Sequence, residues 1–376
     1  MKNIIFLLIF FSAIVVGCGN SAPKEEPLKP VSTAMKGVWI TNVASTALYS
    51  ADNIKESVAI CKKSGITDIF VVVWNKGRTI YPSTIMNTEF GIPIMEEFAG
   101  RDPLQEMISE GHKSGLKVHA WFEYGFAASN NQNGGIILNK YPEWSARDIS
   151  GKLLVSNGGF EWMNGINPQV QNFMKSLVLE VVTKYDVDGV QGDDRLPAMP
   201  VAGGYDTFTV DLYKQEHGGQ APPQNEKDAA WITWRSDKLT AFLGNLYSAV
   251  KAIKPDVVVS SSPSIYPWGK ENYLQDWPTW LDMKYCDLVI PQLYRYDLIA
   301  YSQVLKSQIG YVKKTPDRSK LYGGVLLQIG SWNPTEEYLD GMISENRKNG
   351  VKGEVFFFYE GLKKNSAYFE NTYPTK

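Results

Sequence analysis

Short apolar segments alternate with helix-like stretches along most of this chain, and no other sequence feature restricts its fold as strongly. Each apolar segment has the length of one buried strand, and the stretches between them carry apolar residues at helical spacing. The segments cover residues 37–42, 68–75, 117–123, 188–194, 257–263, 287–294, 321–328 and 353–360. Eight units fit a closed barrel better than a doubly wound open sheet. We therefore predict a single α/β domain over residues 35–376, a (β/α)8 TIM barrel.

Capping signals mark the ends of the helices expected between these strands. Asp52 is expected to cap the first helix, which ends before Gly65, and Asp102-Pro103 opens the second. The expected helices cover residues 52–64, 102–114, 169–184, 236–253 and 335–348.

Two loops are much longer than the others. The chain between the third strand and its helix covers residues 124–168, and the chain between the fourth strand and its helix covers 195–230. Connections in such folds usually take about 2 to 6 residues, so both are insertions. They follow strand ends, which places them on the barrel face where active sites of this fold lie.

The first 34 residues are expected to lie outside the barrel. Lys2 precedes an apolar run over residues 4–17, too short to span a bilayer comfortably and typical of a signal peptide over residues 1–17. The run ends at Cys18 in a lipobox-like sequence, so we expect lipidation of Cys18; a free signal peptide or short anchor helix is the alternative. Residues 18–34 read as a flexible tether. The protein is therefore expected outside the cytoplasm, lipid-anchored to the cell envelope, facing the periplasm or the cell surface.

Composition excludes several classes of partner. The 38 basic and 40 acidic residues give a net charge of −2, too balanced for a nucleic-acid-binding protein. Three histidines and three cysteines without zinc spacing give no sign of a metal, and no phosphate-binding glycine motif or GxSxG elbow occurs. We expect no cofactor, buried free thiols at Cys61 and Cys286, and a monomer.

Carboxylates stand at several strand ends, the position that reads as catalytic in this fold. Asp193 and Asp194 end the fourth strand, and Glu123 ends the third. If Val190 faces the helices, then Gln191 and Asp193 face the barrel interior and Asp194 faces the rim. Each carboxylate could instead be structural, held by backbone groups or by a salt bridge.

Aromatic residues make up 12% of the chain and gather near these strand ends. Flat rings with polar edges suit the C–H faces of sugars, and paired carboxylates suit acetal cleavage. Each ring alone is more often a packing residue, but together they favour a carbohydrate groove. The candidate substrate-binding residues are Trp74, Tyr124, Trp144, Trp162, Gln191, Asp276, Trp277, Gln292, Tyr294, Gln328, Trp332 and Glu360.

Several stretches resemble the glycosyl hydrolase-like 10 family of bacterial extracytoplasmic (β/α)8 proteins. They are KGVWITN at 36–42, HAWFEYGF at 119–126, YDVDGVQGDD at 185–194, WITWR at 231–235, LQDW at 274–277 and FFYE at 357–360. The resemblance implies a glycosidase acting on bacterial wall glycan or another polysaccharide, with the Asp193–Asp194 pair as its central acidic feature. The fourth strand also resembles the chitinase-type pattern DGxDxDxE, from which it departs at Gln191 and at Arg195, where the acidic Glu would stand.

These observations lead to a glycoside hydrolase with three catalytic carboxylates. Asp193 is the expected nucleophile or stabiliser of the oxocarbenium-like state, and Asp194 is expected to orient it or act as base. Glu123 is the expected general acid, with a pKa raised by neighbouring rings. A carbohydrate-binding envelope lipoprotein without turnover is the alternative. Alanine at Trp144, Trp162 or Trp277 is expected to weaken glycan binding and leave the fold intact.

Overall fold

A computed structural model describes residues 35–156, 158–312 and 315–372 of the chain. The predicted signal peptide over 1–17, the lipidation site Cys18 and the tether over 18–34 lie outside the described residues. Over the described ranges, every helix is too short or too polar to cross a membrane.

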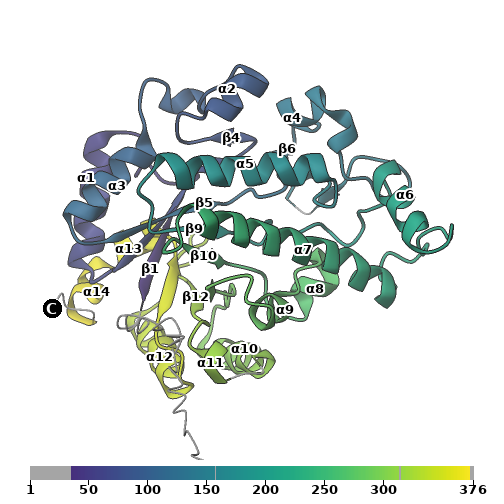
Figure 1. The fold of residues 1–376 in the computed structure, drawn as a ribbon. Helices are drawn as coiled ribbons and strands as arrows, with labels where there is room; N and C mark the ends of the chain where they lie inside the picture. Colours follow the sequence, from purple (N-terminus) through teal and green to yellow (C-terminus); the bar gives the residue numbers. More distant parts are fainter. Residues whose placement is uncertain (1–34, 157, 313–314, 373–376) are drawn as a thin grey trace, which may run out of the picture. The chain divides into compact units, whose positions relative to one another are not determined.

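Eight parallel strands follow one another around a barrel in chain order (Figure 1). They are β1 (Lys36–Ile40), β2 (Asp68–Val72), β5 (Lys117–Phe122), β9 (Gly189–Gly192), β10 (Val258–Ser261), β11 (Leu288–Val289), β12 (Gly323–Leu326) and β13 (Glu354–Phe357). Strand β13 pairs with β1, and parallel bridges at Val289–Leu321 and Gln292–Gly324 join β11 to β12, so the sheet closes. This confirms the predicted (β/α)8 barrel.

The five expected helices are present, and the structure differs from the expectation in the cap of α1, in the start of α7 and in further helices that were not predicted, among them α2, α8, α9 and α10. Helix α1 is capped by Ser50, whose hydroxyl accepts from the Asn53 amide at 3.0 Å, and not by Asp52, which lies in its first turn. Helix α7 begins at Ala229 rather than at residue 236, and α10 was not anticipated. The helices outside the insertions are α1 (Ala51–Lys63), α2 (Thr84–Phe90), α3 (Pro103–Lys113), α5 (Pro168–Lys184), α7 (Ala229–Ile253), α8 (Trp268–Tyr273), α9 (Trp277–Asp282), α10 (Leu298–Tyr311), α11 (Thr315–Arg318), α12 (Glu336–Lys348), α13 (Tyr359–Lys364) and α14 (Ser366–Thr372), with a 3-10 turn η1 (Glu96–Phe98).

The chain between β5 and α5 forms a small antiparallel sheet of its own. It contains β6 (Ala127–Asn130), α4 (Gly135–Lys140), the 3-10 turn η2 (Pro142–Trp144), β7 (Val155–Ser156) and β8 (Phe160–Trp162). Glu161 is buried at its centre and accepts hydrogen bonds from Ser129 and from the backbone amides of Gln132, Asn133 and Gly134. Burial alone would raise the pKa of Glu161, but these hydrogen bonds lower it. A second hairpin, β3 (Trp74–Asn75) with β4 (Arg78–Thr79), follows β2.

The chain between β9 and α7 contains α6 (Thr207–Glu216) and is fastened by a buried arginine. Arg235 donates to the carbonyl oxygens of Val201, Gly203 and Glu226, and its guanidinium lies 4.4 Å from the centre of the Trp231 ring. Burial lowers the pKa of Arg235 to about 10. Apart from the 10 residues of α6, this loop has no helix or strand of its own, so these contacts satisfy carbonyl groups that secondary structure leaves free.

Cys61 and Cys286 are buried free thiols, as expected from the sequence. Burial raises the pKa of Cys286 to about 12 and raises that of Cys61 as well, so neither is a reactive thiolate at neutral pH.

Candidate active site

A cavity of about 110 Å3 opens at the carboxyl ends of the strands, in the mouth of the barrel. Five of the predicted site residues line it together, namely Glu123, Asp193, Asp194, Gln292 and Tyr294. The remaining lining residues are Trp39, Trp121, Arg195 and Phe357. The strand order thus brings side chains from β1, β13 and the ends of β5, β9 and β11 to one place.

Asp193 lies at the bottom of this cavity, on the inward face that strand parity predicts. A Cβ on Gly192 would come within 2.2 Å of the Leu196 carbonyl oxygen, so the tight turn after β9 requires glycine there. Asp193 is 3% exposed; its Oδ1 accepts from Gln292 Nε2 at 2.8 Å and its Oδ2 pairs with Arg195 Nη2 at 3.0 Å. Burial and the nearby charge of Asp194 raise the pKa of Asp193 well above its ordinary value, although Arg195 opposes this.

Arg195 stands at the centre of the carboxylates and was absent from the predicted site. Its Nη1 lies 2.9 Å from Asp194 Oδ1, its Nη2 lies 3.9 Å from Glu123 Oε1, and its Nε donates to the Glu123 carbonyl oxygen at 2.9 Å. Burial alone would lower the pKa of Arg195, but the surrounding carboxylates raise it. One permanent cation therefore balances part of the charge of three acids. Because Arg195 directly follows Asp193 and Asp194 in the sequence, its membership of the site could have been predicted from that position.

Glu123 is held from the opposite side of the cavity. Its Oε2 accepts from Asn75 Nδ2 at 2.6 Å and from Thr41 Oγ1 at 3.3 Å. Burial raises the pKa of Glu123, while Arg195, Asn75 and Thr41 act in the opposite direction. The cause is removal from water, which favours the neutral acid.

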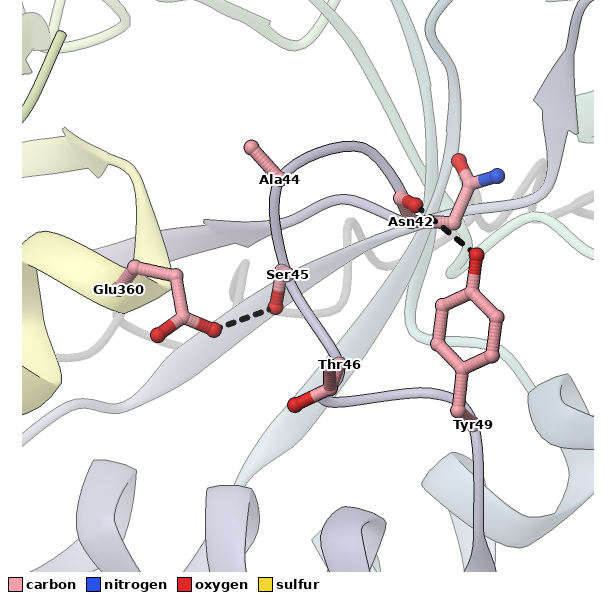
Figure 2. Close-up of a pocket in the computed structure, with 6 residues that line it drawn as sticks. All are labelled: Asn42, Ala44, Ser45, Thr46, Tyr49 and Glu360. Carbon is pink, nitrogen blue, oxygen red and sulfur yellow. Dashed lines mark hydrogen bonds between the residues drawn. The ribbon is translucent and has the colours of Figure 1, made fainter. Parts of the chain in front are cut away.

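Glu360 and Asp276 do not reach this cavity. Glu360 lines a separate hollow and accepts from Ser45 Oγ at 2.6 Å (Figure 2). Asp276 is buried against Lys270, with Oδ2 to Nζ at 2.7 Å, so it is a structural ion pair and the prediction that it binds substrate is corrected.

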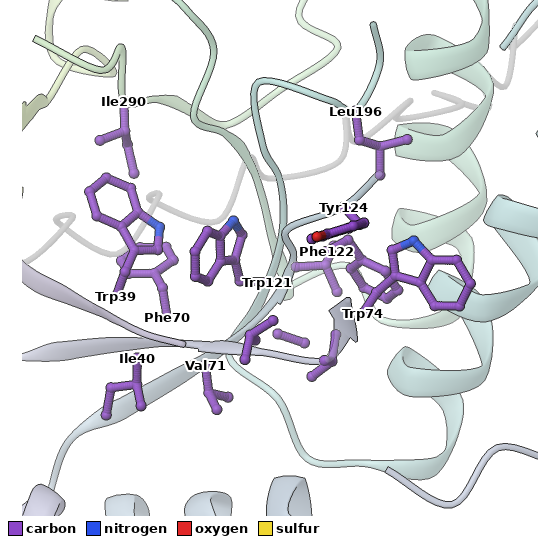
Figure 3. Packing of buried hydrophobic residues seen from close by; sticks show 14 of the residues in the cluster. Trp39, Ile40, Phe70, Val71, Trp74, Trp121, Phe122, Tyr124, Leu196 and Ile290 are labelled. Carbon is purple, nitrogen blue, oxygen red and sulfur yellow. The ribbon is translucent and has the colours of Figure 1, made fainter. Parts of the chain in front are cut away.

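Two tryptophans lie in the barrel interior by the cavity, and neither was on the predicted list (Figure 3). Trp39 Nε1 donates to Gln191 Oε1 at 2.6 Å, and Gln191 Nε2 donates to Ser260 Oγ at 3.2 Å. Gln191 is thus buried with both ends of its amide hydrogen-bonded within the protein, and it is not among the residues that line the cavity. Trp121 Nε1 has no hydrogen-bond partner among the described residues, so it is an available donor beside the carboxylates.

The predicted sugar-binding rings are mostly packing residues. Trp74, Trp162 and Trp277 are at most 1% exposed, and Trp144 and Tyr124 are also buried. Three of the indole groups donate to the protein itself: Trp74 to the Gly125 carbonyl, Trp144 to Gln169 and Trp162 to Ser156. In this structure these five rings are packing residues with little surface to offer a sugar, contrary to the expectation of an open groove lined by them.

Trp277 and Trp268 form a matched pair for testing this correction. Trp277 packs in a buried cluster with Leu243 and Val289, whereas Trp268 is 47% exposed. We expect Trp277→Ala to lower the free energy of unfolding by about 3–5 kcal/mol, because it leaves a large cavity. Trp268→Ala should change it by less than about 0.5 kcal/mol. Denaturant unfolding of both variants checks this, and equal stabilities would contradict the burial of Trp277.

The two remaining predicted residues lie after β12. Gln328 and Trp332 are both half-buried, and Trp332 packs edge-on against Tyr296 at 5.2 Å between ring centres. Neither lines the central cavity. Across the described residues, no group of three or more His, Cys, Asp or Glu side chains is arranged to hold a metal ion.

Solved structures with the same fold are glycoside hydrolases. The glycoside hydrolase domain of PgaB (BpsB) from Bordetella bronchiseptica superposes with a TM-score of 0.68 at 12% identity, covering 91% of this chain and 99% of that domain. The catalytic domain of β-amylase from Paenibacillus polymyxa gives a TM-score of 0.58 at 12% identity, covering 92% of this chain and 100% of that one. At these identities the likeness shows the fold.

Relatives in sequence carry the same description. The glycosyl hydrolase DigH of Escherichia coli K12 is 26% identical over 429 residues, covering 95% of this chain and 93% of the relative. The glycosyl hydrolase YngK of Bacillus subtilis 168 is 25% identical, covering 88% of this chain and 69% of the relative. The family model named glycosyl hydrolase-like 10 matches residues 34–336, most of the barrel, and the chain therefore belongs to the glycosyl hydrolase-like 10 family.

Proposed function

We propose that this protein hydrolyses glycosidic bonds in a polysaccharide, with a bacterial cell-wall glycan as the first candidate. The observation that carries the proposal is the meeting of Asp193, Asp194 and Glu123 in one cavity at the barrel mouth, where burial raises the pKa of two of them. A carboxylic acid that keeps its proton beside another that can carry charge is the arrangement that acetal cleavage requires.

The roles follow from exposure and contacts. Glu123 is proposed as the general acid, because its raised pKa lets it hold a proton for the leaving oxygen. Asp193, fixed by Gln292 and Arg195, is proposed to face the anomeric carbon as nucleophile or as stabiliser of its positive charge. Asp194, with 28% of its side chain exposed, is accessible to water and is proposed to orient Asp193 or act as base.

Carboxyl separation decides the stereochemical outcome. Asp193 Oδ2 and Glu123 Oε1 lie 3.0 and 3.9 Å from the same Arg195 nitrogen, which limits the distance between these two oxygens to about 7 Å. Retaining enzymes need about 5–5.5 Å and inverting enzymes about 6.5–9.5 Å. The limit is compatible with retention and with the narrow end of the inverting range.

Tyr294 and Trp121 supply hydrogen-bond donors for the substrate. Burial and the charge of Asp193 raise the pKa of Tyr294 well above its ordinary value, so its hydroxyl stays protonated. Trp121 lines the same cavity, and its buried Nε1 has no partner among the described residues. A sugar hydroxyl or ring oxygen would satisfy both.

One observation favours the alternative of a sugar-binding protein without turnover. Arg195 forms ion pairs with both Asp193 and Asp194. Hydrolysis at neutral pH needs at least one carboxylate that is available as nucleophile or base. The two functions are separated by incubating the protein with a glycan panel, including peptidoglycan strands with and without stem peptides, and reading products by mass spectrometry. Cleavage supports the hydrolase; calorimetric binding without products supports the alternative.

The proposed location is the cell envelope, with Cys18 carrying the lipid anchor. The support is the sequence of the first 18 residues, in which an apolar run ends directly before cysteine. We expect Cys18→Ser to move the protein from the membrane fraction to the soluble or precursor fraction, detected by immunoblotting. An unchanged distribution between fractions would contradict lipidation at this residue.

A further inference from the structure

We propose that the barrel mouth holds a single glycan chain in a cleft open at both ends, so that internal bonds of the chain are cut. This rests on the proposed function and adds two sugar subsites, one on each side of the carboxylates along the barrel mouth. One lies over β1 and β13, and the other lies over β10 and β11.

The first subsite is a hollow of about 410 Å3 lined by Asn42, Ala44, Ser45, Thr46, Tyr49 and Glu360 (Figure 2). Its chemistry suits a neutral polyol. Glu360 uses one carboxylate oxygen for Ser45, and Asn42 Oδ1 is buried without a partner among the described residues. The ring of Tyr49 is 41% exposed. Carboxylate, amide and hydroxyl groups without a lining cation match sugar hydroxyls rather than an anionic or apolar ligand.

The second subsite is a hollow of about 380 Å3 lined by Ser264, Ile265, Trp268, Gln292, Tyr294 and Arg295. Trp268 is the exposed ring that the predicted site lacked, with 47% of its surface accessible. Gln292 and Tyr294 also line the central cavity, so this hollow adjoins the cavity that contains Asp193. An exposed indole beside polar groups is suited to stacking on a sugar ring.

Strand order places the two hollows at different points around the barrel mouth. Between β13 and β1, which carry the first hollow, and β10 and β11, which carry the second, lies β12 on one side and β2, β5 and β9 on the other. The ends of β5 and β9, which carry Glu123, Asp193 and Asp194, therefore lie on the longer arc between the two hollows.

Cavity size explains why both subsites are needed. Each flanking hollow lies within the range of about 300–1,000 Å3 that ligand sites usually have, whereas the central cavity holds about 110 Å3. Most of the binding surface for a sugar chain is thus outside the catalytic centre, on two sides. An enzyme that cuts only at chain ends would instead have its binding site blocked on one side of the catalytic centre.

The test compares Trp268→Ala and Glu360→Gln with wild type, using N-acetylglucosamine oligomers of increasing length and cell-wall glycan strands as probes. Binding is measured by calorimetry and product lengths by mass spectrometry. We expect wild-type affinity to rise with oligomer length and each variant to lose roughly tenfold of it on long chains, with a smaller loss on short ones. Early products should be internal fragments. Ile253→Ala and Glu110→Gln are matched control substitutions outside both hollows.

Two outcomes would overturn the cleft. One is release of single sugars from chain ends only, and the other is a loss in the variants that is the same for every oligomer length. Failure of the proposed hydrolase function is distinguishable, because calorimetry needs no turnover. If wild type cuts nothing, a length-dependent affinity that both variants weaken still supports the two subsites.

Discussion

Replacing Asp193 by asparagine is expected to lower kcat on a cleavable glycan by about 10³-fold. The amide keeps the volume of the side chain and can still accept from Gln292 Nε2, which lies 2.8 Å from Oδ1. It cannot attack the anomeric carbon or carry the negative charge that stabilises an oxocarbenium-like state. Rates from reducing-end release, with binding measured separately, check the effect. Binding should persist, because the flanking hollows are untouched.

The fold of this variant should survive. The amide matches the carboxylate in size and keeps the hydrogen bond from Gln292 Nε2 at 2.8 Å, so the buried cavity stays filled and its neighbours stay bonded. Arg195 retains its pair with Asp194 at 2.9 Å. Asp186→Asn is the matched control, since its side chain is 88% exposed at the other end of the same strand segment. Full activity of Asp193→Asn would remove Asp193 from the mechanism.

The barrel could be predicted because its signal is repeated eight times. Each apolar segment matched one strand, and closure followed from their number. The first and last residues of β11 could not be predicted from this repeated pattern. The sequence predicts a strand over 287–294, but β11 covers only Leu288–Val289, and single bridges connect it to β12. Pro291 has no amide hydrogen to donate toward β12, so the ladder is interrupted there.

The carboxylate site was predictable for a related reason. Strand parity put Asp193 toward the interior, and the ends of parallel strands meet at one face, which brought Glu123 to it. The aromatic residues carried no such information. Position in a loop says that a ring is near the mouth, but whether it faces solvent depends on the loop's own packing. Trp162 is buried in the sheet of the first insertion, and Trp144 is buried in the turn η2 against Tyr141 and Phe173. Neither arrangement follows from a periodic pattern in the sequence.

Glu123→Gln is expected to lower the rate on a natural glycan by about 10³-fold and to remove the alkaline limb of its pH profile. A general acid acts only while protonated, so wild-type kcat/KM should fall as pH rises through the pKa of Glu123. Burial raises that pKa, which extends activity to higher pH than an ordinary carboxylic acid would allow. Glutamine cannot titrate, so the variant's remaining activity should lack this fall.

Leaving-group dependence separates proton donation from positioning. The nitrophenolate of a nitrophenyl glycoside leaves without being protonated. Glu123→Gln should therefore lose far less of its rate of bond cleavage on that substrate than on the glycan. Equal losses on both would mean that Glu123, through Asn75 and Thr41, only orders the cavity. Glu143→Gln, on the exposed turn of the first insertion, is the control.

Stability gives a second reading of the same group that needs no substrate. The pKa of Glu123 is raised in the folded protein, so between the ordinary pKa and the raised one the folded protein holds a proton that the unfolded chain has released. The contribution of Glu123 to the free energy of unfolding therefore falls as pH rises through this window. Glu123→Gln removes that dependence. The stability difference between variant and wild type should therefore shift in the variant's favour across this window, measured by denaturant unfolding at a series of pH values. A difference that stays constant with pH would mean that Glu123 is charged in the folded protein throughout this window, and another group would have to be the general acid.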